Sequence, residues 1–319
     1  MNLTDVAGRV TGVLSSRFLL VAYLPVLAGA LPLVVLVWAG APGGTPDFSG
    51  AWETAGSLGI GESLVLVLAL LVPAFLLQSL QLSLHTLWRE GPPWRWWRRR
   101  RSAFWQGRRE ALAERARLPA DFPSLGPAER DAATARAWPA ASRLNRRFPP
   151  AGTPTRPTAL GNLLTAMEHS AGRAHGWDAA VAWPRLYPVL RDPARSLVDD
   201  ARDALDQAIG LATVMSLCAP LSLALLWPSG WWTLLTLVPA ILAVGAYRAA
   251  LRSAATYAVA VHGAFDLHRF DLLRALHLQL PADPAGERAL AAALCDLWRQ
   301  DFPLPPDTRY HHGEPIGGP

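Results

Sequence analysis

Four ionisable residues stand close together in the segment FDLHRFD, namely Asp266, His268, Arg269 and Asp271. On a helix, Asp266 and Arg269 share one face and can pair locally, while His268 and Asp271 share another. A histidine in this setting could sense pH, because its ordinary pKa of about 6.5 is near cytoplasmic pH. A solvated, charged helix face is the simpler interpretation of the same pattern.

Charged and polar side chains also stand at the edges of long apolar runs. Asp206 and Arg252 are each 23 residues from Ser229, at the centre of a short turn, and Asp203 and Arg248 lie at similar heights. Charges at such places usually pair or face water, so a functional pair and a salt-bridge ladder that holds two helices in register both fit. The polar residues that could line a pore or carry charge within a membrane are Gln78, Gln81, His85, Asp203, Asp206, Arg248 and Arg252.

The residues that could bind metal have poor spacing for that role. Glu168, His169 and His175, and the segment YHHGE near the C-terminus, lack paired ligands four residues apart with a third ligand in view. The chain also has no phosphate-binding glycine loop, no dinucleotide fingerprint and no nucleophile elbow. We therefore expect no metal, no cofactor and no enzymatic activity. The two cysteines, Cys218 and Cys295, are too few for a disulfide framework.

Long apolar runs must position these residues. The chain is 51% hydrophobic and only 17% charged, whereas soluble proteins average roughly 25% charged residues. A membrane-spanning helix needs about 20 apolar residues, and the sequence predicts an all-α integral membrane protein with two hairpins of two spans each. A signal peptide is the alternative for the first run, which is longer than signal segments usually are. The predicted spans are residues 18–40, 62–85, 206–227 and 231–253.

Each predicted span contains proline: Pro25 and Pro32, then Pro73, Pro220 and Pro239. Proline bends a helix by removing a backbone hydrogen bond, so kinks in all four spans could serve gating. The alternative is that proline is simply more frequent in membrane helices.

The distribution of arginine predicts the orientation. Arginines precede the first span and follow the second, whereas the segment between these spans carries only Asp47, Glu53 and Glu62 as charges. By the positive-inside rule, both termini are expected in the cytoplasm.

The segment WREGPPWRWWRRRRSAFWQGRRE, residues 88–110, could bind nucleic acid or mark a membrane boundary. Because it directly follows the second predicted span, we expect its tryptophans in the interfacial aromatic belt and its arginines on anionic inner-leaflet lipid. This position does not favour nucleic acid. The arginines expected to contact anionic lipid are Arg95, Arg98, Arg99, Arg100 and Arg101.

The rest of the chain is predicted as helical cytoplasmic structure. Residues 89–192 form a helical region between the hairpins, with helices over about 102–117, 127–147, broken at Pro139, and 158–173. Residues 193–281 hold the second hairpin, whose last helix continues for about 50 residues toward Pro281. Residues 1–88 form the first hairpin, and residues 282–319 a C-terminal cytoplasmic tail that is partly disordered.

Two stretches, PTALGNLLTAMEHSAGRAHGWDAAVAWPRLYPVL and FDLHRFDLLRALHLQLP, resemble an uncharacterised multi-pass family of bacterial membrane proteins. The resemblance implies a bacterial inner-membrane location and supports the domain organisation over about residues 145–281, but it implies no activity. It departs from the family pattern at Trp177, where leucine is expected, and at Ala159, where arginine is expected. The matching residues are Leu160, Gly161, Asn162, Gly176, Asp178, Ala179, Trp183, Pro184, Arg185, Leu186, Phe265, Asp266, Leu267 and Arg269.

Two functions fit this organisation, and two others fit it less well. A homo-oligomeric ion channel is the first, because polar residues gather in the inner half of the second span. A non-conducting membrane anchor that recruits a cytoplasmic partner protein is the alternative. A secondary transporter is disfavoured, since four spans are few and no internal repeat is visible. An enzyme acting on lipid would need a nucleophile and a base, and neither stands out.

Overall fold

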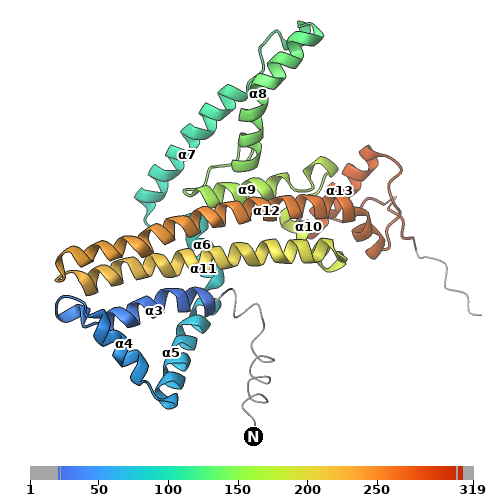
Figure 1. The fold of residues 1–319 in the computed structure, drawn as a ribbon. Helices are drawn as coiled ribbons and strands as arrows, with labels where there is room; N and C mark the ends of the chain where they lie inside the picture. The colour runs from blue at the N-terminus through green and yellow to red at the C-terminus, as the bar shows by residue number, and fades with distance from the viewer. Residues whose placement is uncertain (1–20, 22, 307, 312–319) are drawn as a thin grey trace, which may run out of the picture. The chain divides into compact units, whose positions relative to one another are not determined.

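The computed structural model describes residues 21, 23–306 and 308–311. Within this part of the chain the fold is all-helical, with 79% helix and no strand. The start of the first predicted span lies outside the described residues, as does part of the C-terminal tail. The α-helices are α3 (Leu24–Trp38), α4 (Phe48–Ser57), α5 (Ile60–Ser79), α6 (Gln81–Glu90), α7 (Arg95–Ala116), α8 (Pro127–Arg147), α9 (Ala159–Ser170), α10 (Ala179–Leu186), α11 (Ala194–Leu226), α12 (Leu237–Ala275) and α13 (Pro284–Gln300) (Figure 1).

The chain divides into two compact units. We call residues 1–88 and 202–253 the apolar unit, and residues 89–201 and 254–319 the polar unit. The boundaries between the units fall within α6, α11 and α12.

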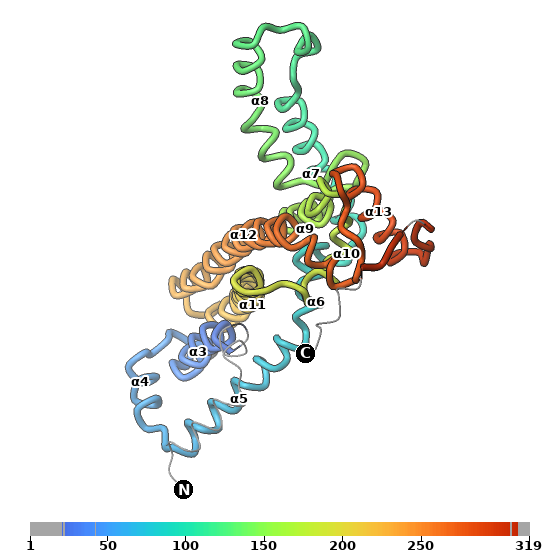
Figure 2. The backbone as a smooth tube through the Cα atoms, turned by 90° about the vertical axis from the view of Figure 1, so that its right-hand side faces the viewer, coloured from blue at the N-terminus to red at the C-terminus, as the bar shows by residue number. Residues whose placement is uncertain are grey.

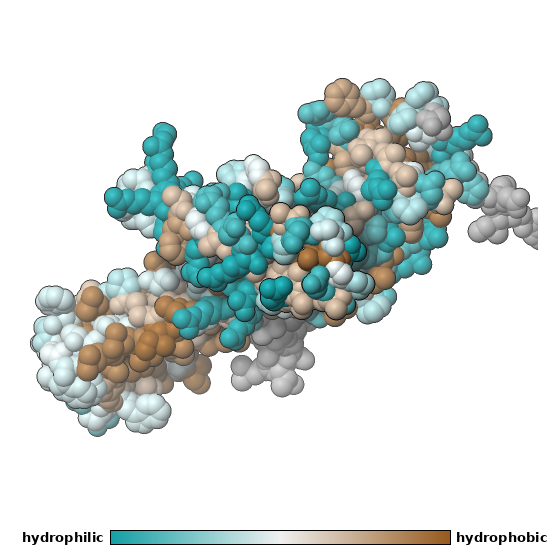
Figure 3. Space-filling model, turned by 90° about the horizontal axis from the view of Figure 1, so that it is seen from above, coloured by the Kyte–Doolittle hydropathy of each residue, from teal (hydrophilic) through white to brown (hydrophobic). Residues whose placement is uncertain are grey.

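Among the described residues, three helical stretches are long and apolar enough to cross a membrane: Ile60–Ser79, Ala194–Leu226 and Gly230–Ala275. The last of these joins the 3-10 helix η6 (Gly230–Thr236) to α12. The helix α3 is apolar but has only 15 described residues. The side chains of α5 and of the apolar first part of α12 are largely exposed on the single chain; Ile60, for example, is 92% exposed. Figure 3 shows apolar side chains, in brown, gathered on one part of the molecular surface. Such an apolar patch is suited to contact with lipid or with another protein chain.

Close packing in the apolar unit depends on a glycine in α3. A Cβ atom at Gly29 would lie 2.3 Å from Cγ1 of Val214 and 2.8 Å from Sγ of Cys218, both on α11. Only glycine lets the two helices approach this closely, which is typical of helix packing in membranes. At the end of α11, Ser229 donates a hydrogen bond of 2.5 Å to the carbonyl of Gly44.

The prolines of the predicted spans take different places in the helices. Pro32, Pro73 and Pro220 lie inside helices. Pro25 falls in the first turn of α3, and Pro239 falls in the first turn of α12, which follows the 3-10 helix η6 directly. A gating role for kinks at these prolines stays a prediction. The predicted break at Pro139 is wrong, since α8 continues from Pro127 to Arg147.

The polar unit has one main hydrophobic core. Its most buried side chains include Phe265, Leu186, Leu273 and Val198, and the cluster draws on α10, α13 and parts of α11 and α12. The helices α7 and α8 form a hairpin that meets α9 at its base (Figure 2). The helix α7 begins at Arg95, seven residues earlier than the prediction from residue 102.

The end of the chain differs most from the prediction. The helix α12 stops at Ala275, and His277 takes a left-handed backbone conformation with φ of 55°, so the helix does not run on to Pro281. The helix α13 follows within the predicted tail. Residues Arg309 and His311 then hydrogen bond through their backbones to Gln279 and His277, so this described part of the tail is ordered against the polar unit.

Candidate functional site

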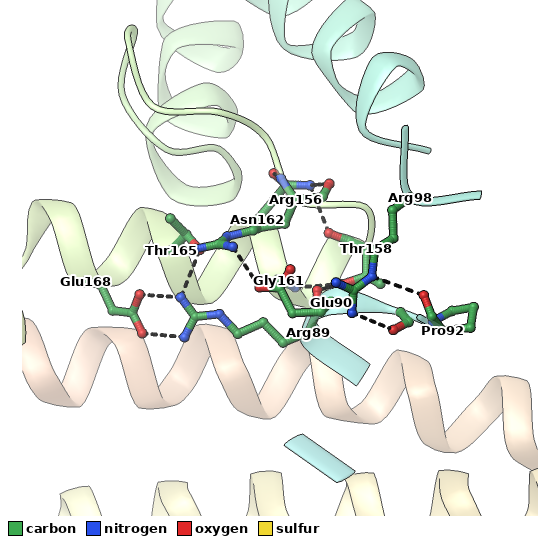
Figure 4. Close-up of polar contacts among 11 residues, drawn as sticks. Arg89, Glu90, Pro92, Arg98, Arg156, Thr158, Gly161, Asn162, Thr165 and Glu168 are labelled. Carbon is green, nitrogen blue, oxygen red and sulfur yellow. Dashed lines mark hydrogen bonds and ion pairs between the residues drawn. The ribbon is translucent and has the colours of Figure 1, made fainter. Parts of the chain in front are cut away.

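A polar network in the polar unit holds the start of the segment 89–98 against α9 (Figure 4). The guanidinium of Arg89 donates two hydrogen bonds, of 2.6 and 2.5 Å, to the two carboxylate oxygens of Glu168. It donates a third, of 3.1 Å, to the hydroxyl of the buried Thr165. The hydrogen bonds from Glu168 favour the charged guanidinium and raise the pKa of Arg89 above its ordinary value.

Asn162 fastens the loop before α9. The side chain is 1% exposed, and its amide donates bonds of 2.8 Å to the carbonyls of Arg156 and Thr158. Its carbonyl oxygen accepts a bond of 2.8 Å from the backbone N–H of Arg156. Asn162 thus uses both amide hydrogens and its oxygen to satisfy backbone groups of one short loop.

Gly161 is needed because a backbone carbonyl sits directly on it. A Cβ atom at this position would lie 2.2 Å from the carbonyl oxygen of Arg89. That oxygen accepts a bond of 2.7 Å from the hydroxyl of Thr158, which also caps α9 by accepting from the N–H of Gly161. Close packing at Gly161 and the hydrogen bonds of Asn162 to backbone groups therefore account for these two residues of the Leu-Gly-Asn segment.

The remaining charges of this network are paired or satisfied by carbonyls. Arg156 lies 2.7 Å from the carboxylate of Glu90, and Arg98 donates bonds of 3.0 and 3.2 Å to the carbonyls of Pro92 and Gly91. Glu168, considered above as a metal ligand, forms an ion pair with Arg89. The network thus has a structural role: it holds the segment that follows Arg89 against α9 and the loop before α9.

The segment from Trp177 to Arg185 also contributes to packing. Trp177 is buried and stacks on Trp298 of α13 with ring centroids 6.0 Å apart. Asp178 caps α10 by accepting from the N–H of Ala180 and forms an ion pair with Arg299. Cζ of Arg185 lies 4.6 Å from the centroid of the Trp298 ring, which is a favourable cation–π contact.

The FDLHRFD segment is arranged differently from the prediction. The carboxylate of Asp266 lies 3.2 Å from Nε2 of His175, while Nε of Arg269 lies 2.6 Å from Glu287 on α13. The expected side-chain pair of Asp266 and Arg269 is thus wrong, because each has a partner on another element; Arg269 contacts only the backbone carbonyl of Asp266.

His268 and Asp271 are hydrogen bonded at 2.9 Å between Nδ1 and the carboxylate. This bond is the main cause that lowers the pKa of Asp271, and Arg274 contributes in the same direction. A role of His268 in pH sensing stays a prediction.

In the apolar unit, a histidine and a buried aspartate meet beside the end of α5. Nε2 of His85 on α6 lies 2.7 Å from the carboxylate of Asp206 on α11, and Asp206 is 5% exposed. Three residues further along α6, Trp88 donates a bond of 2.8 Å to the hydroxyl of Thr213 and stacks on Tyr247. Sequence reasoning assigned His85 to a pore lining and did not foresee this contact, since the two residues are far apart in the chain.

The other predicted polar residues of the spans lie nearer the surface. Gln78, Arg248 and Arg252 are exposed, and Gln81 and Asp203 are half-buried. Pairing of Asp203 and Asp206 with Arg248 and Arg252 stays a prediction.

The predicted lipid-contacting arginines on α7 fall into two groups. Arg95, Arg99 and Arg100 are exposed, with Arg100 over the Trp96 ring at 5.9 Å. Arg98 and Arg101 are half-buried, and Arg101 lies within 6 Å of the rings of Trp97, Phe104 and Trp105.

No known family, curated protein or solved structure matches this chain. The family resemblance therefore stays an expectation, and the functional argument depends on the chain's own geometry.

Proposed function

We propose that the chain is a four-span protein of the bacterial inner membrane, with both termini in the cytoplasm, whose apolar unit assembles with further copies into an anion-conducting pore. We propose no catalytic activity for it. The observation that carries this proposal is the exposure of polar side chains on helices that are otherwise apolar. Gln78 on α5 and Arg248 on α12 both lie on the surface of the single chain.

Contact with lipid chains is energetically unfavourable for these two polar side chains. A charged side chain inside a span is costly, by on the order of 3 kcal/mol at the bilayer centre and by less toward the end of the span, and such residues usually face a protein interior or a water-filled cavity. A second copy packed on this face, or water enclosed by several copies, would remove that cost. A ring of arginines contributed by several subunits would favour anions over cations.

The face of α12 that carries Arg248 is also suited to close helix packing. Gly245 and Arg252 lie on the same exposed face, one turn before and one turn after Arg248, and Ile241 lies one turn before Gly245. A Cβ atom at Gly245 would meet nothing within 4 Å in the single chain. Small residues on an exposed face of a membrane helix commonly let a second helix approach.

The substitution Gly245→Leu tests the assembly. Because the position is open in the single chain, the larger side chain should leave the fold intact and disrupt only the contact between copies. We expect the detergent-purified protein to shift from a defined oligomer toward monomer, measured by light scattering, while its melting temperature stays unchanged. Gly107→Leu, on α7 and equally open, is the matched control and should leave the oligomer intact.

The substitutions Arg248→Gln and Arg248→Glu test conduction. In liposomes of neutral lipid, we expect the wild type to pass chloride, Arg248→Gln to reduce the flux severalfold, and Arg248→Glu to favour cations. Ile241→Ala, on the same face of α12, should leave the flux within about twofold. Equal chloride flux in all four proteins would refute a role of Arg248 in the pathway.

A non-conducting anchor that recruits a cytoplasmic protein is the second candidate. The α7–α8 hairpin favours it, because Trp96 and Trp138 are 60% and 67% exposed, and exposed aromatic side chains are common at protein interfaces. A monomeric protein that passes no ions and retains one partner in proportion to its own amount, with loss of that partner in Trp138→Ala, would support the anchor over the channel.

A further inference from the structure

A cavity of about 420 Å³ lies in the polar unit, between the α7–α8 hairpin and the end of α9. Its polar side chains include Arg109, His169 and Arg173, and its apolar wall includes Leu144 and Phe148. This volume is within the usual range for small-molecule sites, which is roughly 300–1,000 Å³. Chloride or inorganic phosphate would fill only a small part of it.

The cavity carries positive charge that its own lining does not neutralise. No carboxylate is among the lining residues. Arg109 donates bonds of 2.8 and 3.4 Å to the backbone carbonyls of Thr153 and Pro150, and these acceptors hold the guanidinium in place without cancelling its charge. Among the residues that the structure describes, neither Arg109 nor Arg173 forms an ion pair with a carboxylate.

His169 adds a third polar group with a defined orientation. Its Nδ1 lies 2.9 Å from the carbonyl of Thr165. Because a carbonyl only accepts, Nδ1 carries the proton, and Nε2 remains for a ligand. An arginine fork and a histidine together suit a phosphate group, which offers several acceptor oxygens and can carry a hydroxyl.

The apolar wall indicates that the ligand is more than an inorganic anion. Phe148 is 5% exposed, and its ring together with Leu144 and the adjacent prolines forms a surface for an apolar or ring-shaped group. We propose that this cavity binds a phosphate ester, with its phosphate on Arg109, His169 and Arg173 and its organic part on Phe148. This site goes beyond the proposed pore and does not depend on it.

Arg173→Gln is the sharpest test, because Arg173 is exposed and its loss should not disturb the fold. The matched control is Arg143→Gln on α8, which removes the same charge from an exposed residue outside the cavity. The full-length protein in nanodiscs of neutral phosphatidylcholine would be titrated with adenosine monophosphate, glycerol 3-phosphate and inorganic phosphate by calorimetry. A second set of nanodiscs would contain phosphatidylglycerol, with lipid retention measured after purification.

We expect saturable binding of at least one ester, weakened about tenfold in Arg173→Gln and less than twofold in Arg143→Gln. Inorganic phosphate should bind at least tenfold more weakly than that ester. Binding of the soluble esters in neutral nanodiscs supports a soluble ligand. Retention of phosphatidylglycerol that depends on Arg173, without ester binding, supports a lipid headgroup as the source of the phosphate. Absence of both, or an equal loss in the two variants, overturns the proposal.

Discussion

Replacing Asn162 by alanine should destabilise the polar unit more than any comparable substitution of a surface amide. The side chain satisfies three backbone groups of the loop before α9, each through a bond of 2.8 Å. Alanine fits the helix, so the substitution removes the hydrogen bonds without straining the backbone.

The size of the effect follows from the two backbone groups of Arg156 left without a partner, since the carbonyl of Thr158 still accepts from the backbone N–H of residue 162. A buried donor or acceptor that loses its partner costs about 1–3 kcal/mol. The loop is only partly buried, and water can reach some of it, so we expect about 1 kcal/mol for each group, or roughly 2 kcal/mol in total. For a domain of this size, 1 kcal/mol shifts the melting temperature by roughly 2–4 °C, which predicts a decrease of about 4–8 °C.

The measurement is thermal unfolding of the full-length protein in detergent, followed by tryptophan fluorescence. Asn145→Ala on α8, an exposed asparagine, is the control and should change the melting temperature by less than about 2 °C. Asn162→Asp should not rescue the variant, because a carboxylate can accept from Arg156 but cannot donate to the two carbonyls. An Asn162→Ala protein that melts with the wild type would refute the structural role given to this residue.

Three further predictions concern the polar unit. Arg89→Gln should cost about 2 kcal/mol in chemical unfolding, and adding Glu168→Gln to it should cost little more, because each single change already breaks the same pair. The lowered pKa of Asp271 stabilises the folded state above the ordinary aspartate pKa, and this contribution is lost as pH falls through the folded value. The stability gap between wild type and Asp271→Asn should therefore close as the pH is lowered into the acid range, as melting curves would show. Burial raises the pKa of the Cys295 thiol, so in a Cys218→Ser background iodoacetamide should label it at least tenfold more slowly in the folded protein than after denaturation.

The sequence predicted features that depend on neighbouring residues. Hydropathy located the apolar stretches of α5, α11 and α12, because the tendency of a helix to enter a membrane is a sum over its own residues. The start of α11 near Pro193 and most of α8 followed from local helix signals in the same way. The missed helix α13 also has a local signal, since Asp283 accepts bonds from the N–H groups of Ala285 and Gly286 and Pro284 occupies the first turn.

The partners of the charged residues could not be predicted from spacing. Arg89 and Glu168 are 79 residues apart, and His85 and Asp206 are 121 residues apart. Helical periodicity pairs a residue with those three or four positions away, as in the expected pair of Asp266 and Arg269. A buried carboxylate on another element, here Glu287, offers a stronger contact than an exposed neighbour, so tertiary packing decided the outcome for Arg269.

The same reasoning narrows the lipid contact expected from the arginine-rich helix α7. Every arginine there is charged, but a side chain already committed to the protein cannot reach a headgroup without losing that contact. Arg98 is bonded to the carbonyls of Gly91 and Pro92, and Arg101 lies among three aromatic rings. Each of the exposed Arg95, Arg99 and Arg100 can contribute about 1 kcal/mol at an anionic surface. Lipid binding by this segment should therefore follow the loss of these three arginines, whereas loss of Arg98 should act through the stability of the loop that precedes α7.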